Sequence, residues 1–155
     1  MATLQSFEEG IPISKLSNTF RDAITITRRL SIGYIRIDLL CIIQDSLLDW
    51  QQESAKIRSF YDLSFLNIAA TGSVNREEGC FKKSNPFLGR PCEIHVTWFG
   101  SPGLLPGRYI CLPCFIWNQH VENSPLVKRA WVLQKQFLAP RTLHFGTTQL
   151  FWEYC

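Results

Sequence analysis

The sequence predicts an α/β fold, in which a partial parallel sheet with crossover helices is followed by a C-terminal β-hairpin. Residues 34–43 and 65–70 are apolar runs with little alternation, the pattern of strands buried on both faces. Residues 47–61 between them have helical spacing, so the order strand, helix, strand implies a right-handed crossover and a parallel strand pair. Near the end of the chain, 141–145 and 149–155 flank Gly146-Thr147-Thr148 and predict the hairpin.

The remaining elements follow from caps, turn residues and apolar spacing. Ser17 or Asn18 caps a helix that runs to about Leu30 and ends before Gly33. Residues 71–92 are rich in turn residues and predict a long loop. Beyond the loop we expect strands at 93–99 and 108–117, and then a helix at 126–138 that ends before Pro140.

Length and composition indicate a single folded domain over residues 1–155. The 155 residues are 46% hydrophobic and 19% charged, which excludes a disordered chain. The net charge of +3 is small and the basic residues are scattered, so we expect no nucleic-acid partner. No run approaches the ~18 apolar residues of a membrane span, and the N-terminus lacks an apolar signal region. We therefore expect a cytoplasmic protein with no membrane partner and with reduced cysteines.

A polar cluster follows the first predicted strand, at the edge where open α/β sheets bind ligands. Gln44 and Asp45 leave this strand, and Glu53 lies on the next helix, three residues after Trp50. We expect the three polar side chains to converge there. An acid held against an indole has a raised pKa, which suits general acid/base chemistry or the binding of a sugar hydroxyl. The structural alternative is that Asp45, Ser46 or Asp49 caps the helix and that Trp50 docks in the core.

Cys111 and Cys114 form a Cys-x-x-Cys pair with His120 nearby, a pattern found in metal and redox sites. Residues three apart on a strand point to opposite faces, and no second pair of ligands with matching spacing occurs. We therefore expect no metal site. His95 and His144 lie inside predicted strands, and we interpret them as structural histidines with satisfied hydrogen bonds.

Three blocks of the sequence together resemble the fungal heterokaryon incompatibility (HET) domain. In order they are LSNTFRDAITITRRLSIGYIRIDLLCIIQDSLLDWQQESAKIRSFYDLSFLNIAATGS, EEGCF and RAWVLQKQFLAPRTLHFGTTQLFWEYC. The most specific part is Cys-Ile-Ile-Gln-Asp followed by Asp-Trp-x-x-Glu. The resemblance implies an interaction or effector module in fungal non-self recognition and programmed cell death. Its implied partners are other proteins of incompatibility signalling, with self-association as a further option.

The resemblance also implies roles for individual residues. HET domains have been compared with Toll/interleukin-1 receptor domains, in which a Glu a few residues after a Trp cleaves NAD. By that analogy Glu53 is the catalytic acid with Asp45 as its helper, and Gln44, Trp50 and Asp38 bind the ligand. NAD is a cofactor or substrate only by this analogy; the first hypothesis is a module with no cofactor and no enzymatic activity.

The chain departs from the family pattern at several positions. The usual opening strand, with Tyr-x-Ala-Leu-Ser-Tyr-x-Trp-Gly, does not precede Gly10, so we expect the domain to lack its first strand. Leu39 stands where Ser is common and Lys135 where Glu is common, which removes two polar groups of the implied site. Arg36 and Gln136 replace a common Trp and Arg. A third hypothesis is therefore a truncated copy without biochemical function, and we expect little or no NAD cleavage.

Overall fold

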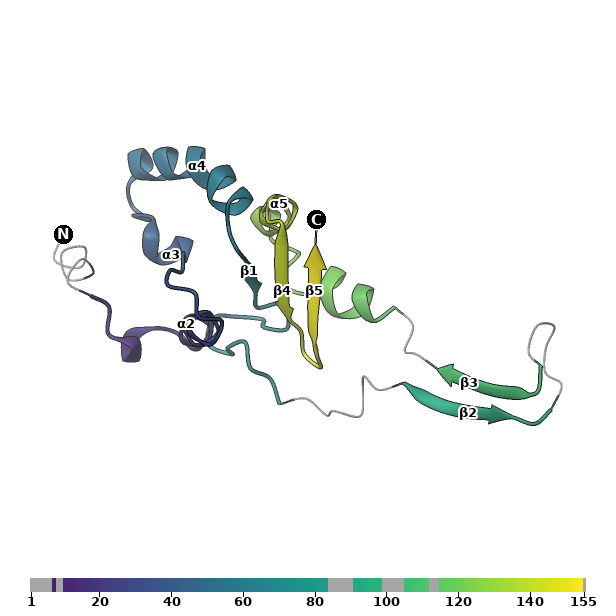
Figure 1. Cartoon of the computed structure of the whole chain (residues 1–155). Coiled ribbons are helices and arrows are strands. Elements are labelled where there is room, and N and C mark those ends of the chain that lie inside the picture. Colours follow the sequence, from purple (N-terminus) through teal and green to yellow (C-terminus); the bar gives the residue numbers. More distant parts are fainter. Residues whose placement is uncertain (1–6, 8–9, 84–90, 99–104, 112–114, 155) are drawn as a thin grey trace.

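The computed structural model describes residue 7 and residues 10–83, 91–98, 105–111 and 115–154. Its centre is a three-stranded sheet of β1 (Asn67–Ala69), β4 (Arg141–Phe145) and β5 (Leu150–Tyr154), in the order β1–β4–β5. β1 runs parallel to β4, and β4 runs antiparallel to β5 (Figure 1). The predicted α/β class with a partly parallel sheet is confirmed, while the likeness to Toll/interleukin-1 receptor domains stays a prediction.

β4 and β5 form the C-terminal hairpin that the sequence predicts. In its register Thr142 lies opposite Glu153, and His144 lies opposite Phe151. The Gly146 N–H donates to the Gln149 carbonyl oxygen at 3.1 Å and closes the turn. A Cβ at Gly146 would lie 2.8 Å from that oxygen, so the turn requires glycine at this position.

Two of the three longer helices begin and end close to their predicted bounds. α2 (Asn18–Arg29) begins after Ser17, and α4 (Leu47–Asp62) begins after Ser46. The Asp49 N–H donates to the Ser46 hydroxyl at 3.2 Å, so Ser46 is the side chain that caps α4. α5 (Ala130–Leu138) begins four residues later than predicted, because residues 126–129 form turns.

The prediction of a strand at residues 34–43 is wrong. Ile37 and Ile42 are extended but pair in no sheet, and between them α3 (Asp38–Cys41) makes a single helical turn, with the Cys41 N–H bonded to Ile37 O at 3.0 Å. The parallel pairing of this segment with β1 is therefore also wrong, since β1 pairs with β4. A short apolar run has the same pattern in a strand and in a helical turn, so its composition does not decide between them.

A second, two-stranded sheet is formed by β2 (Cys92–Val96) and β3 (Gly107–Cys111), which pair antiparallel. Figure 1 shows this hairpin standing away from the three-stranded sheet. The predicted strand at 108–117 is too long: β3 ends at Cys111, residues 112–114 lie outside the described residues, and residues 116–117 begin a helical turn. That turn continues as a π-helix, η2 (Asn118–Glu122).

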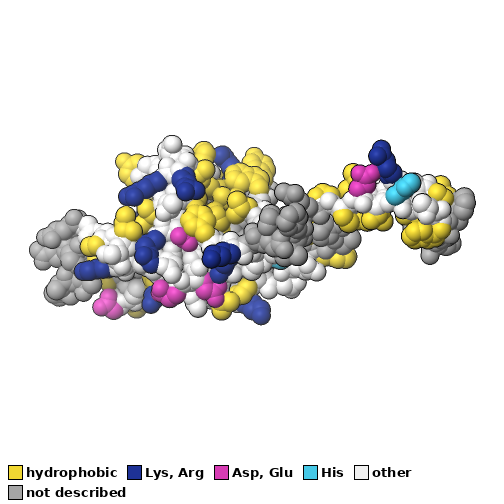
Figure 2. Space-filling view, turned by 90° about the horizontal axis from the view of Figure 1, so that it is seen from below, with side chains coloured by type: hydrophobic (Ala, Val, Ile, Leu, Met, Phe, Trp, Pro, Cys, Tyr) yellow, Lys and Arg dark blue, Asp and Glu magenta, His cyan; other side chains and the backbone are white. Residues whose placement is uncertain are grey.

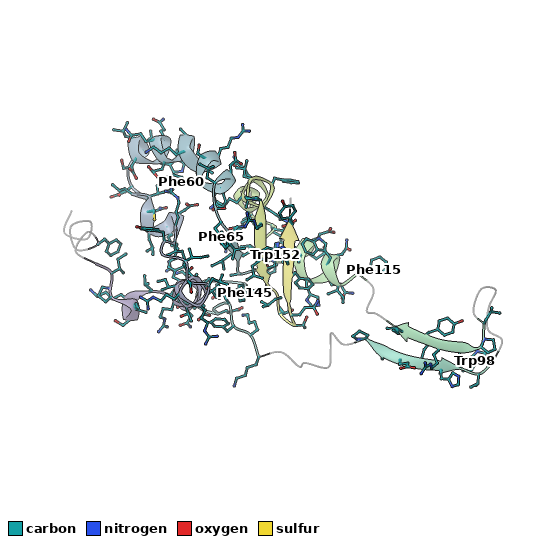
Figure 3. The ribbon with its side chains drawn as sticks, in the orientation of Figure 1. Phe60, Phe65, Trp98, Phe115, Phe145 and Trp152 are labelled. Carbon is teal, nitrogen blue, oxygen red and sulfur yellow. The ribbon has the colours of Figure 1, made fainter. Side chains whose placement is uncertain are left out.

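The core of the main body lies between α2 and the three-stranded sheet. Ile26 of α2, Cys80 and Phe145 of β4 are buried together, and Phe145 is labelled in Figure 3. The loop after β1 supplies Cys80 and is fixed to α2 by Asp22, whose carboxylate accepts a hydrogen bond from the Cys80 N–H at 2.7 Å. The long loop predicted from the turn residues therefore forms part of the core over its first half.

The surface carries no single basic area on the face seen in Figure 2, where Lys and Arg side chains alternate with apolar and acidic ones.

A 3-10 turn, η1 (Ile13–Lys15), precedes α2. None of the helices in the described ranges is long and apolar enough to cross a membrane.

Candidate functional site

Five charged side chains from three parts of the chain form one connected set of ion pairs, here termed the charged cluster: Arg36, Asp38, Glu53, Lys56 and Lys135. Arg36 bridges its two acids, with Nε 3.1 Å from Asp38 Oδ1 and Nη2 3.0 Å from Glu53 Oε2. Lys56 Nζ lies 3.0 Å from the second oxygen of Glu53, and Lys135 of α5 pairs with the second oxygen of Asp38. Each carboxylate is therefore held by two cations.

The elements around the cluster explain why these groups meet. The extended segment before α3 carries Arg36 toward α4, where its guanidinium lies 4.0 Å from the centre of the Phe60 ring. Phe60 lies on the side of α4 that faces α3 (Figure 3). Lys135 reaches Asp38 across the Tyr61 ring, with Nζ 5.6 Å from the ring centre. Asp38 and Lys135 thus connect α3 to α5, two elements far apart in the sequence.

The cations determine the ionisation of the two acids. Hydrogen bonds from Lys56 and then Arg36 lower the pKa of Glu53. Burial is the largest influence on Asp38 and raises its pKa, but Lys135 and Arg36 together outweigh it, so the pKa of Asp38 is lowered. The expectation that Trp50 raises the pKa of Glu53 is therefore wrong. At neutral pH both acids accept hydrogen bonds and neither holds a proton to donate.

A cavity of about 460 Å³ lies beside the charged cluster. Its wall combines the cluster residues Arg36, Asp38 and Lys135 with aromatic side chains, and the aromatic residues are Phe20, Tyr34, Phe60, Tyr61 and Phe65. Asp38 is the one predicted site residue in this wall, while Glu53 is held behind it by Arg36. The cavity has the size of a small-molecule site.

The other predicted site residues lie apart from this cavity. The side chains of Gln44 and Asp45 are exposed, and the Gln44 amide donates to the Ile42 carbonyl oxygen at 2.9 Å. In the part of the chain that the structure describes, no hydrogen bond or ion pair joins either residue to Glu53. Trp50 is 45% exposed on α4 and so does not dock fully in the core. The catalytic and ligand-binding roles that the resemblance implies for these residues stay predictions.

A second polar network was not predicted from the sequence. Thr71 Oγ1 lies 3.0 Å from His144 Nδ1, and His144 Nε2 lies 3.0 Å from Glu153 Oε2. The Gln136 amide donates to both oxygens of Glu153 at 2.9 Å. His144 is therefore a structural histidine with satisfied hydrogen bonds, as predicted. It lines a second cavity, of about 300 Å³, which shares Lys135 with the first.

The sequence signal for this second network was weak, because its members come from four parts of the chain and follow no motif: the turn after β1, α5, β4 and β5. Only the strand alternation of Thr142 and His144, two polar residues on one face of β4, indicated that this face meets polar partners.

Within the described ranges, no three His, Cys, Asp or Glu side chains group so as to hold a metal ion. Cys114, half of the Cys-x-x-Cys pair, lies outside these ranges.

Residues 1–135 match the model of a protein family described as "Heterokaryon incompatibility protein (HET)". The chain belongs to the heterokaryon incompatibility family. The matched range includes α2, α3, α4 and β1 and ends within α5, so β4 and β5 lie beyond it. No curated protein and no solved structure matches the chain.

Two departures from the expected family pattern meet in the charged cluster. Arg36 and Lys135, two positions at which the sequence resemblance predicts a departure from the family pattern, are the cations that bind Asp38. The two departures are therefore coupled in space. Together they place a pair of positive charges on an acid of the HET signature segment.

Proposed function

We propose that this protein acts in fungal non-self recognition, as an interaction or effector module in the cytoplasm whose signalling leads to growth arrest and programmed cell death. The observation that carries the proposal is the match to the heterokaryon incompatibility family over residues 1–135. Its partners in this role are other proteins of incompatibility signalling, including further copies of itself.

The charged cluster supports a module that does not cleave NAD. The nucleophile or acid of a glycoside-cleaving site needs one face of its carboxylate open to the sugar. Both oxygens of Glu53 are occupied, one by Arg36 and one by Lys56, each at 3.0 Å. In this proposal Glu53 fixes the segment before α3 onto α4. An NAD-cleaving enzyme with Glu53 as its acid and Asp45 as its helper is the alternative.

The test is expression of the full chain from an inducible promoter in a filamentous fungus, with growth, cell viability and cellular NAD measured after induction. We expect growth arrest and cell death before any fall in NAD. Gly72→Ala is the control for a fold-dependent effect, because the added Cβ would lie 2.6 Å from the Gly146 carbonyl carbon. A chain that leaves growth unchanged at high protein level would refute the proposal.

A matched pair of variants separates the proposal from the alternative. Glu53→Gln removes the acid, whereas Lys56→Met removes one of its ion pairs and keeps the carboxylate. At equal protein levels we expect cellular NAD to be the same in both variants as in the unchanged chain, because in this proposal Glu53 serves the fold and not a reaction. If Glu53→Gln abolished both death and NAD loss while Lys56→Met retained both, Glu53 would be catalytic and the alternative would hold.

A further inference from the structure

Two cysteines face each other across the two-stranded sheet. The register of β2 and β3 places Cys92 directly opposite Cys111. Residues directly opposite in an antiparallel pair have Cα atoms about 4.5 or 5.5 Å apart. Disulfides span Cα separations of about 4.4–6.8 Å. The backbone of the hairpin therefore already holds the two residues at a separation that a disulfide requires.

The side chains of this pair also lie on the same face. Opposite residues in a ladder project to the same side of the sheet, so Cys92 and Cys111 project together with Ile94 and Tyr109. The other face carries the polar residues of the hairpin, including the ion pair of Arg108 with Glu93 at 3.4 Å. Both cysteine side chains therefore project from the same face at one end of the ladder.

The cysteines of the chain differ in their access to an oxidant. Cys92 is exposed and Cys111 is half-buried. Cys80, in contrast, is buried, and burial raises the pKa of its thiol to about 12, which keeps it protonated and unreactive. Cys41 is exposed but lies on α3, in a different part of the chain from the hairpin. The hairpin pair is therefore the pair to which the described structure gives both access and proximity.

We propose that Cys92 and Cys111 are a reversible dithiol–disulfide site, oxidised by a low-molecular-weight disulfide of the glutathione type. The thiolate of Cys92 attacks the oxidant, forms a mixed disulfide and releases one small thiol. The thiolate of Cys111 then attacks the sulfur of Cys92 and releases the second small thiol. The two protein thiols lose two protons and two electrons, and the oxidant disulfide is reduced to two thiols.

The bond would lock a part of the fold that has little else to stabilise it. The described hairpin contains two strands with five register pairs, and β2 is exposed along all but its last residue. A two-stranded hairpin is marginally stable at best by itself. The pair closes the end of the ladder where the chain enters β2 and leaves β3. A bond there restricts opening of the whole hairpin.

Oxidised glutathione added to the purified full chain tests the chemistry. The Cys114→Ser variant is used, because trypsin leaves Cys111 and Cys114 on one peptide, 109–128. We expect an intact mass about 2 Da lower, a cross-link between peptides 84–108 and 109–128, and its loss on reduction. A further Cys111→Ser change removes the cross-link, while Cys41→Ser retains it. A glutathione adduct that stays on Cys92 without a cross-link would overturn the proposal.

A second measurement tests the lock. Trypsin cleavage after Arg108 in β3 is followed with and without the disulfide, at the same protein concentration. Because cleavage requires local opening, we expect it to be about tenfold slower in the oxidised chain. Cys92→Ser should show one rate in both conditions. Equal rates in the oxidised and reduced chains, with the cross-link present, would refute the lock.

Discussion

Replacing Asp38 with Asn tests whether the charged cluster joins α3 to α5 energetically. The change keeps the shape of the side chain but removes its charge, so Lys135 and Arg36 each lose an anionic partner. The side chains of Asp38, Arg36 and Lys135 are 21%, 24% and 26% exposed, so water replaces the lost partner only in part.

The expected loss lies between two limits. Two unit charges 3.1 Å apart, the Arg36–Asp38 separation, attract by about 5 kcal/mol at an effective dielectric constant of about 20. The cost of taking the charges out of water cancels most of this attraction. Fully exposed pairs contribute up to about 1 kcal/mol, and removing one partner of a buried pair costs about 3–5 kcal/mol. We therefore expect Asp38→Asn to lower the free energy of unfolding by about 2 kcal/mol, or the melting temperature by about 4–8 °C.

Urea unfolding followed by circular dichroism measures this loss. Asp45→Asn is the matched control, since Asp45 is exposed and the described residues give it no hydrogen bond or ion pair; its effect should stay within about 0.5 kcal/mol. Lys135→Met completes a double-mutant cycle, in which the combined variant should lose less than the sum of the single changes. If Asp38→Asn destabilised the protein no more than Asp45→Asn, the ion pairs would have no role in joining these elements.

Three further outcomes follow from the structure. The pKa of Asp38 in the folded chain lies below its usual value of 3.8. The charged Asp38 therefore stabilises the fold fully above pH 3.8, and this stabilisation is lost as the pH falls through the lowered pKa. Asp38→Asn should remove this part of the decrease in unfolding free energy at acid pH. Gly72→Ala should cost about 2 kcal/mol in urea unfolding, because its Cβ would overlap the backbone of the β4–β5 turn, whereas Gly33→Ala enters open space and should be neutral to within about 0.5 kcal/mol. Iodoacetamide at pH 8 should label the exposed Cys41 at least about tenfold faster than the buried Cys80, as mass spectrometry of peptides would report; equal rates would contradict the packing of the loop after β1 on α2.

Local signals predicted those parts of the fold that short stretches of chain determine. Ser46 precedes α4 and caps it, since its hydroxyl accepts a hydrogen bond from the Asp49 N–H; Ser17 precedes α2 as predicted, but its side chain makes no capping hydrogen bond. Gly146 marked the hairpin turn, where a side chain does not fit. The prediction for 34–43 failed because a short apolar run has the same composition in a strand and in a helical turn, and Asp38 of this segment pairs with Lys135, a residue of the distant α5. No local pattern contains that information.

The candidate site, like the fold, was predicted from the sequence only in part. The polar cluster predicted from the residues was Gln44, Asp45 and Glu53, and the resemblance added Asp38. The structure joins Asp38 to Glu53 through Arg36. Nothing in the sequence indicated that Arg36 bridges the two acids, because Arg36 by itself is an ordinary basic residue next to an apolar run. Gln44 was placed in the site on the assumption that a strand delivers it to a sheet edge, and no strand is present there.

The parallel pairing of β1 with β4 joins two strands that lie far apart in the sequence. Asn67 of β1 bonds to Thr142 across 75 positions of sequence, its side-chain amide donating to the hydroxyl at 3.3 Å. During synthesis β1 leaves the ribosome long before its partner exists, and its backbone groups stay paired with water until residues 141–145 emerge. Helical turns of α2 and α4 form within microseconds meanwhile, but short helices are marginal in water without tertiary contacts. The three-stranded sheet is complete only after residues 141–145 have been made, and a chain stopped before Arg141 would lack the strand with which β1 and β5 both pair.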